Sequence, residues 1–191
     1  MTPVALSETI AVGEVPTRDQ IAILAKAGFR SLLNTQPDGE VARHLTSAQC
    51  RDEAHKQGLV YQHQPIESRR PLDDAIAGFA AAVAGMPKPI YACCYSGSRT
   101  AAAWALAAAA RQEPGSIISA CAEAGYDIAF MRDDLAARHA AANAAAKPVT
   151  AQSTVAVNGH AVNGAATAVP ALVPSIVLPR AASAGGFAVS G

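Results

Sequence analysis

The segment KPIYACCYSGSRT, residues 88–100, contains the features that decide the fold. Ile90–Cys93 is a short apolar run typical of a buried strand, and Gly97 lies in the tight turn that follows it. A helix is expected to begin near Arg99 and to continue through the alanine-rich residues 100–111. A strand, a tight loop and a helix in this order direct backbone N–H groups toward one point, where an anion can bind.

The residue types in the loop Cys94–Arg99 suit the binding and attack of an oxyanion. A helix N-terminus and a neighbouring guanidinium both favour a thiolate, so Cys94 is the candidate nucleophile. Gly97 permits a positive φ that lets backbone N–H groups converge, and Arg99 offers a planar pair of donors. Thr100 is placed to donate a hydrogen bond to the sulfur. We expect the oxyanion to contact Tyr95, Ser96, Gly97, Ser98, Arg99 and Thr100. The alternative is a buried cysteine pair beside a solvated arginine, but an arginine in a first helical turn opposes the dipole unless an anion partners it.

Outward from this loop, the chain alternates helical and strand-like segments. Thr17 and Thr46 each precede a glutamine by three residues, a capping box, and these predict helices over residues 17–27 and 46–58. Further elements are expected as strands at Phe29–Asn34 and Leu59–Gln64, and as helices at residues 71–85, 114–124 and 128–142. The apolar face of the helix over 71–85 comprises Leu72, Ile76, Phe79 and Val83. This alternation predicts an α/β fold with helices on both faces of a sheet, as parallel strands require.

The composition indicates a globular domain with a buried core. Of 191 residues, 51% are apolar and 16% are charged, which is enough apolar surface for one domain. Fifteen basic and fifteen acidic residues give a formal net charge of +0, so no broad positive field favours nucleic acid or anionic lipid. No stretch reaches the ~18 consecutive apolar residues of a spanning helix. We expect a soluble cytoplasmic protein without nucleic-acid or membrane partners, whose four cysteines stay reduced.

The character of the sequence changes near Ala144. From there to the C-terminus the only charged residues are Lys147 and Arg180, and small residues and prolines dominate without a helical or alternating period. We expect a catalytic domain over residues 1–143 and a disordered low-complexity tail over residues 144–191. A docking segment is the alternative, because the tail is more apolar than ordinary disordered chains.

Several stretches match landmarks of one bacterial family. They are IAVGEVPTRDQIAILAKAGFRSLLNTQPDGE (residues 10–40), YQHQPIE (61–67), the loop Cys94–Arg99 and AGYDI (124–128). On these residues the chain resembles the beta-lactamase hydrolase-like proteins, in their phosphatase-like domain, a relative of dual-specificity phosphatases that is also named as a sulfur transferase family. The resemblance runs from about Leu6 to Leu135 and covers none of the tail. It implies a phosphatase-like α/β sandwich of three layers with a mostly parallel central sheet.

The spacing within the loop leaves two chemistries open. Phosphatases of the family have five residues between cysteine and arginine, with glycine third after the cysteine. Here four residues separate Cys94 from Arg99, as in rhodanese-like sulfurtransferases, and Gly97 is third. Counting from Cys93 restores five residues but moves the glycine one place late, so Cys94 remains the better nucleophile.

The breadth of the resemblance favours a hydrolase that acts on a phosphate ester or similar small oxyanion through a covalent cysteine intermediate. The loop spacing favours a sulfurtransferase that passes a persulfide sulfur from Cys94. A non-catalytic module that only binds an anion is the third hypothesis. We expect no metal and no cofactor, and the partner is a small anionic substrate or a phosphoprotein.

A phosphatase also needs a general acid to protonate the leaving oxygen. The resemblance implies an aspartate on the loop after the second predicted strand, and that loop reads ESRR at residues 67–70. Glu67 is therefore the candidate acid. The alternative is a solvated glutamate that pairs with Arg69 or Arg70.

Other polar residues carry weaker signals. Asp73 and Asp74 lie in the first turn of a predicted helix, where carboxylates are favoured by the dipole alone. His63 near a strand end could reach the loop, although a histidine at the edge of the core is the simpler interpretation. Cys50 and His55 are five residues apart on one predicted helix and point in different directions, which argues against a shared metal.

Overall fold

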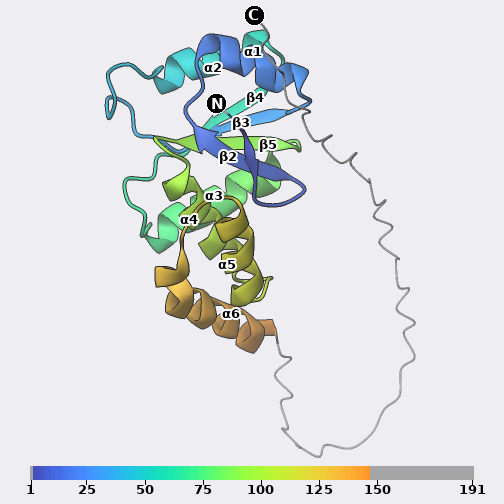
Figure 1. The fold of residues 1–191 in the computed structure, drawn as a ribbon, viewed down its shortest axis with the longest axis vertical. Coiled ribbons are helices and arrows are strands. Elements are labelled where there is room, and N and C mark those ends of the chain that lie inside the picture. The colour runs from blue at the N-terminus through green and yellow to red at the C-terminus, as the bar shows by residue number, and fades with distance from the viewer. Residues whose placement is uncertain (1, 147–191) are drawn as a thin grey trace, which may run out of the picture. The chain divides into compact units, whose positions relative to one another are not determined.

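Five strands form one sheet in the part of the chain that the structure, a computed structural model, describes, residues 2–146. Their order across the sheet is β1-β2-β5-β3-β4 (Figure 1). The strands are β1 (Val4–Ala5), β2 (Ile10–Glu14), β3 (Ser31–Asn34), β4 (Val60–His63) and β5 (Ile90–Cys94). β1 pairs antiparallel with β2, and the other pairs are parallel. The sheet is therefore mostly parallel, as expected.

The helices lie on both faces of this sheet. They are α1 (Arg18–Lys26), α2 (Ser47–Lys56), α3 (Asp73–Gly85), α4 (Ser98–Ala108), α5 (Pro114–Glu123), the 3-10 helix η1 (Ala129–Met131) and α6 (Arg132–Ala146). Figure 1 shows α1 and α2 on one side of the strands and α3, α4, α5 and α6 on the other. The result is the predicted three-layer arrangement. No helix among residues 2–146 is both long and apolar enough to cross a membrane.

The central strand β5 separates two apolar clusters. Tyr91 and Cys93 pack with residues of α1 and α2, whereas Ile90 and Ala92 pack with residues of α3 and α4. This follows from the period of two along a strand, which sends successive side chains to opposite faces. All five residues of β5 are buried, consistent with a parallel strand covered on both faces.

Local signals in the sequence are confirmed at both predicted capping boxes. Thr17 accepts a hydrogen bond from the backbone N–H of Gln20, whose side chain in turn accepts from the backbone N–H of Thr17. Thr46 and Gln49 make the same pair of bonds at the start of α2. Each box satisfies two N–H groups that a helix N-terminus otherwise leaves without partners.

Three features differ from the sequence-based expectations. Leu72 was assigned to the apolar face of α3 but precedes the helix as its N-cap, 80% exposed, so that assignment is wrong. The strands β1 and β2 were not expected. Helix α6 continues to Ala146, past the expected boundary at 143, and the remainder of the predicted tail lies outside the described residues.

Candidate active site

Cys94 is the last residue of β5 and lies at the carboxyl end of the central strand. Its carbonyl accepts a hydrogen bond from the backbone N–H of Val15 at 3.0 Å, which fixes the strand end next to the segment after β2. Cys94 is opposite Glu14 in the parallel register, while Cys93 is opposite Asn34. The carboxyl ends of three neighbouring strands therefore meet around this cysteine, where parallel α/β sheets place their ligands.

Gly97 turns the chain from β5 into α4. It is the N-cap of the helix and has a φ of 84°, in the left-handed region that favours glycine. The Tyr126 side chain also packs directly against it, because a Cβ atom at position 97 would overlap the Tyr126 hydroxyl. The turn predicted from the sequence therefore needs glycine for two reasons, and the second involves a residue far along the chain.

A Gly97→Ala variant is expected to lose about 2 kcal/mol of unfolding free energy and most of any activity, because alanine is strained at positive φ and also collides with Tyr126. Chemical denaturation measures the loss. Gly58→Ala is the matched control, because Gly58 also has a positive φ but open space around its Cα. Equal losses in the two variants would show that the Tyr126 contact contributes nothing.

The two adjacent cysteines have different surroundings. The Cys93 side chain lies in the cluster under α1 and α2, and its thiol points to Asn34 Oδ1 at 3.8 Å. Burial raises the pKa of the Cys93 thiol well above its ordinary value, so this group stays neutral. Cys94 projects toward the other face of β5, on the side where α4 begins. This arrangement favours Cys94 over Cys93 as the nucleophile.

Arg99 is held in place by three hydrogen bonds to two residues. Its Nη1 donates to the carbonyl of Ile66 at 2.9 Å, and its Nη2 donates to the carboxylate oxygens of Glu40 at 2.6 and 2.7 Å. The Arg99 side chain is only 11% exposed and that of Glu40 is 34% exposed. A guanidinium has five N–H donors, so Nε and further N–H groups remain for an oxyanion.

Thr100 makes a different bond from the one expected. The Thr35 hydroxyl donates to the carbonyl of Cys93 at 2.9 Å, so Thr100 supplies the proton of the 2.8 Å bond between the two threonine hydroxyls. Both threonines are buried. The proton that the sequence analysis assigned to the Cys94 sulfur is therefore committed to Thr35, and Thr100 ties the start of α4 to the end of β3.

Tyr95, Ser96 and Ser98 of the loop lie near the surface of the protein. Tyr95 is 48% exposed and stacks on His44, with ring centroids 6.0 Å apart and an interplanar angle of 26°. The hydroxyls of Ser96 and Ser98 are within hydrogen-bond distance of each other at 3.1 Å. The loop thus presents hydroxyl groups and an aromatic ring around the cysteine.

Glu67 lies on the segment that joins β4 to α3, next to the residue whose carbonyl binds Arg99. Its side chain is exposed and makes no hydrogen bond or ion pair with any other residue of 2–146. The alternative pairing with arginine is wrong, because Arg69 donates to the carbonyl of Asp127 at 3.2 Å and both Arg69 and Arg70 lie over the Phe130 ring. Glu67 is free to approach a ligand.

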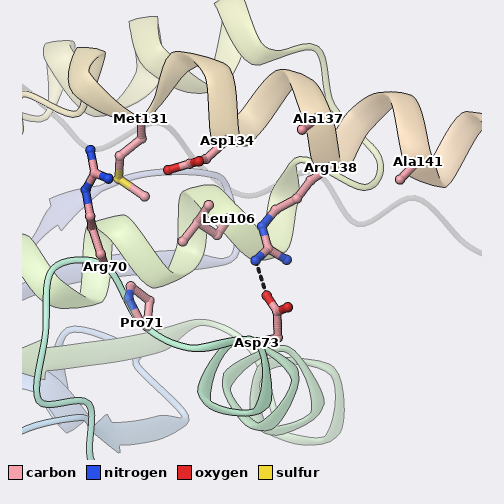
Figure 2. A pocket seen from close by; sticks show the side chains of 9 residues that line it. All are labelled: Arg70, Pro71, Asp73, Leu106, Met131, Asp134, Ala137, Arg138 and Ala141. Carbon is pink, nitrogen blue, oxygen red and sulfur yellow. Dashed lines mark hydrogen bonds and ion pairs between the residues drawn. The ribbon is translucent and has the colours of Figure 1, made fainter.

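Asp73 belongs to a separate hollow. It pairs with Arg138 of α6 at the edge of a groove of about 520 Å³ that also contains Arg70, Leu106 and Met131 (Figure 2). No residue of the Cys94–Arg99 loop lines this groove. Asp73 is therefore paired with Arg138 in a groove away from the Cys94–Arg99 loop.

The remaining histidine and cysteine candidates lie away from the loop or are bonded within the protein. His63 bonds through Nε2 to the carbonyl of Gln36 at 2.8 Å. Burial raises the pKa of the Cys50 and Cys121 thiols to about 12 each. His55 is exposed, whereas Cys50 is buried. Across residues 2–146, no three histidine, cysteine or acidic side chains gather as a metal site would require.

Two residues of the site were missed as functional candidates. Glu40 lies in the stretch 10–40 and Tyr126 in AGYDI, and neither residue type marks a site by itself. The Tyr126 ring forms one wall of a small hollow of about 300 Å³ with Gly13, Glu14 and Ser96. Burial, with smaller effects of Cys94 and Glu14, raises the pKa of the Tyr126 phenol, so it remains a hydrogen-bond donor. The only available signal was that both residues fall in landmark stretches.

A comparison with known families agrees with this geometry. Residues 4–111 match the family described as beta-lactamase hydrolase-like protein, phosphatase-like domain. The chain belongs to this family. The beta-lactamase hydrolase-like protein of Xylella fastidiosa strain Temecula1 is 28% identical to the phosphatase-like chain over 106 residues, 56% of this chain. The chain spans only a quarter of the length of that relative, 25%.

Solved structures share the fold of this phosphatase-like domain. A candidate phosphatase of Neisseria meningitidis superposes with a TM-score of 0.65 at 22% identity, over 72% of this chain and 99% of the other. PTPMT1 superposes with a TM-score of 0.59 at 18% identity, over 76% of this chain and 98% of the other. At these identities the likeness shows the fold, and it confirms the predicted phosphatase-like α/β class.

Proposed function

We propose that the protein is a cysteine-dependent hydrolase of phosphate esters. The observation that carries this proposal is the position of Cys94, at the end of the central strand, between Gly97 at the cap of α4 and Arg99 in its first turn. Backbone N–H groups at a helix N-terminus and a guanidinium together suit a phosphoryl group with its negative charge. The substrate is a small phosphate ester or a phosphoprotein.

The reaction proceeds in two steps. The Cys94 thiolate attacks phosphorus, an S–P bond forms, and the P–O bond to the leaving group breaks with its electron pair staying on oxygen. Water then attacks phosphorus, releasing phosphate and returning the thiolate. Arg99 and the N–H groups of the loop stabilise charge on the phosphoryl oxygens in both steps.

Glu67 is the proposed acid for the first step. Arg99 binds the carbonyl of Ile66, which fixes the neighbouring Glu67 near the mouth of the loop. The Glu67 carboxyl has no partner among residues 2–146, so it can turn toward a leaving oxygen and donate a proton. In the second step the same carboxylate accepts a proton from the attacking water.

Sulfur transfer is the second candidate, and the spacing of four residues between Cys94 and Arg99 favours it. A shorter loop makes a smaller cradle, which suits a persulfide better than a phosphoryl group. In this reaction the thiolate attacks the outer sulfur of a donor such as thiosulfate and releases sulfite. The Cys94 persulfide then passes its outer sulfur to cyanide, forming thiocyanate.

Two assays on the full chain separate these functions. We expect turnover of p-nitrophenyl phosphate and of phenyl phosphate, and no thiocyanate from thiosulfate and cyanide. In a Glu67→Gln variant, phenyl phosphate hydrolysis is expected to fall about 100-fold and p-nitrophenyl phosphate hydrolysis by less than about tenfold, because p-nitrophenolate leaves without a proton.

Each outcome has a distinct meaning. Thiocyanate without phosphate release would replace the hydrolase by a sulfurtransferase. Neither product, together with binding of phosphate, would indicate an anion-binding module. Equal losses for both esters in Glu67→Gln would remove Glu67 as the acid but keep the hydrolase.

A further inference from the structure

A second groove, of about 410 Å³, lies beside the catalytic loop. It is bounded by the turn from β2 into α1 and by the segment that precedes α2. Its lining residues are Val15, Pro16, Thr17, Arg18, Asp19, Arg43, His44 and Leu45. Nothing in the proposed mechanism uses this groove.

Two contacts join the groove to the first residues of the loop, Cys94 and Tyr95. The backbone N–H of Val15, which lines the groove, donates to the carbonyl of Cys94. His44, which also lines the groove, stacks on Tyr95, the residue directly after Cys94. His44 is itself oriented by Gln36, whose side-chain oxygen lies 3.0 Å from the His44 Nδ1. The groove therefore adjoins the start of the Cys94–Arg99 loop, so a ligand bound in the loop has the groove beside it.

The groove contains two arginines, of which Arg18 has a weak electrostatic interaction with the Glu53 carboxylate. Arg18 and Arg43 are both exposed, and neither makes a hydrogen bond or ion pair with a described residue. Asp19 is the only carboxylate in the lining. The positive end of the α1 dipole adds to the charge of the arginines. A planar guanidinium binds phosphate and carboxylate through paired N–H donors, so the groove suits an anion.

The small hollow lined by Glu14, Tyr126 and Ser96 carries a negative charge, in contrast to the groove with the two arginines. Glu14 is exposed, makes no side-chain bond within residues 2–146, and lines the small hollow with Tyr126 and Ser96. A carboxylate without a counter-ion disfavours a second negative charge there. A substrate with two anionic groups is therefore expected to place its second group toward Arg18 and Arg43.

We propose that this groove binds a second anionic group of the substrate, so that the enzyme prefers small phosphate esters whose leaving group carries a further phosphate or carboxylate. The inference rests on the proposed function, because Cys94 is taken to hold the first phosphoryl group. Arg18 and Arg43 are then residues of substrate specificity, and the chemistry at Cys94 does not depend on them.

A binding experiment tests the groove without requiring turnover. The Cys94→Ser variant of the whole 191-residue chain is titrated calorimetrically with alkanediol bisphosphates of increasing chain length and with the matching alkyl monophosphates. We expect one bisphosphate to bind about tenfold or more tightly than its monophosphate. Arg18→Gln with Arg43→Gln should abolish this preference, whereas Arg30→Gln, an exposed arginine at the other end of β3, should not.

Turnover of the same esters by the native protein completes the test. If the monophosphate is hydrolysed and every bisphosphate has an equal kcat/KM and equal binding, the groove inference is overturned and the hydrolase stands. If no ester is hydrolysed while the bisphosphate preference in binding persists and needs Arg18 and Arg43, the hydrolase is overturned and the groove remains an anion site. If the preference for a bisphosphate survives Arg18→Gln with Arg43→Gln, the groove inference is overturned whether or not the protein is a hydrolase.

Discussion

A Cys94→Ser variant is expected to lose at least about three orders of magnitude in phosphate ester turnover while keeping its fold and its affinity for phosphate. The serine hydroxyl is a poor nucleophile without an adjacent base, and the substitution replaces one atom at a residue that is 1% exposed. Arg99 and the backbone N–H groups of the loop are unchanged, so the anion site persists. Steady-state kinetics and thermal unfolding measure the two halves of this result.

Cys93→Ser is the matched control, because it makes the same change one residue earlier. Cys93 packs under α1 and α2, and its neutral thiol bonds to Asn34. We expect turnover within about fivefold of the native protein and a small loss of stability, since a hydroxyl replaces a thiol in an apolar cluster. Retained activity in Cys94→Ser with loss in Cys93→Ser would move the nucleophile upstream and restore the spacing of five residues found in family phosphatases.

Elements with strong local signals were predictable from the sequence. The capping boxes at Thr17 and Thr46 place α1 and α2 within one residue of their observed starts, because such boxes depend only on residues three apart. The apolar run at residues 90–93 and the glycine after it likewise located β5 and the start of α4.

Elements that depend on partners far along the chain were not predictable. β2 is a run of five residues whose pairing with β5 determines its position, and β1 consists of only two residues paired with β2. Leu72 has the right residue type and spacing for the apolar face of α3. However, the helix begins at Asp73, so Leu72 is left in solvent.

The residues of the candidate site also fall into those predictable from local sequence and those that depend on distant partners. Cys94, Gly97 and Arg99 lie within six residues and were identified from their types and order. Glu40 reaches Arg99 across 59 positions of sequence, and Tyr126 reaches Gly97 only after α4 and α5 have been placed. Thr100 was given the wrong partner because Thr35, which is buried beside it, comes from β3's carboxyl end.

An Arg99→Lys variant is expected to lose about 100-fold in kcat/KM for phosphate esters although the charge is retained. The guanidinium binds Ile66 through one nitrogen and Glu40 through another, and still has N–H groups for an oxyanion. A lysine has one nitrogen with three N–H groups, so it cannot reach both protein partners and the substrate in one geometry. Loss of two charged hydrogen bonds from Arg99 to the phosphoryl oxygens of the substrate, of about 1.5 kcal/mol each, accounts for the predicted factor.

Glu40→Gln separates the role of the charge on Arg99 from the role of its shape. The amide oxygen can still accept one of the two hydrogen bonds that Arg99 Nη2 donates to the carboxylate, whereas the amide nitrogen cannot accept the other. This bond and the one to the Ile66 carbonyl keep the guanidinium in place, and its positive charge is no longer partly neutralised by the carboxylate. We therefore expect phosphate to bind Glu40→Gln at least as tightly as the native protein, with kcat within about tenfold. If Arg99→Lys retains the native kcat/KM, Arg99 does not bind the reacting group. If Glu40→Gln instead loses as much activity as Arg99→Lys, the carboxylate itself acts in the reaction, and Glu40 rather than Glu67 becomes the candidate acid.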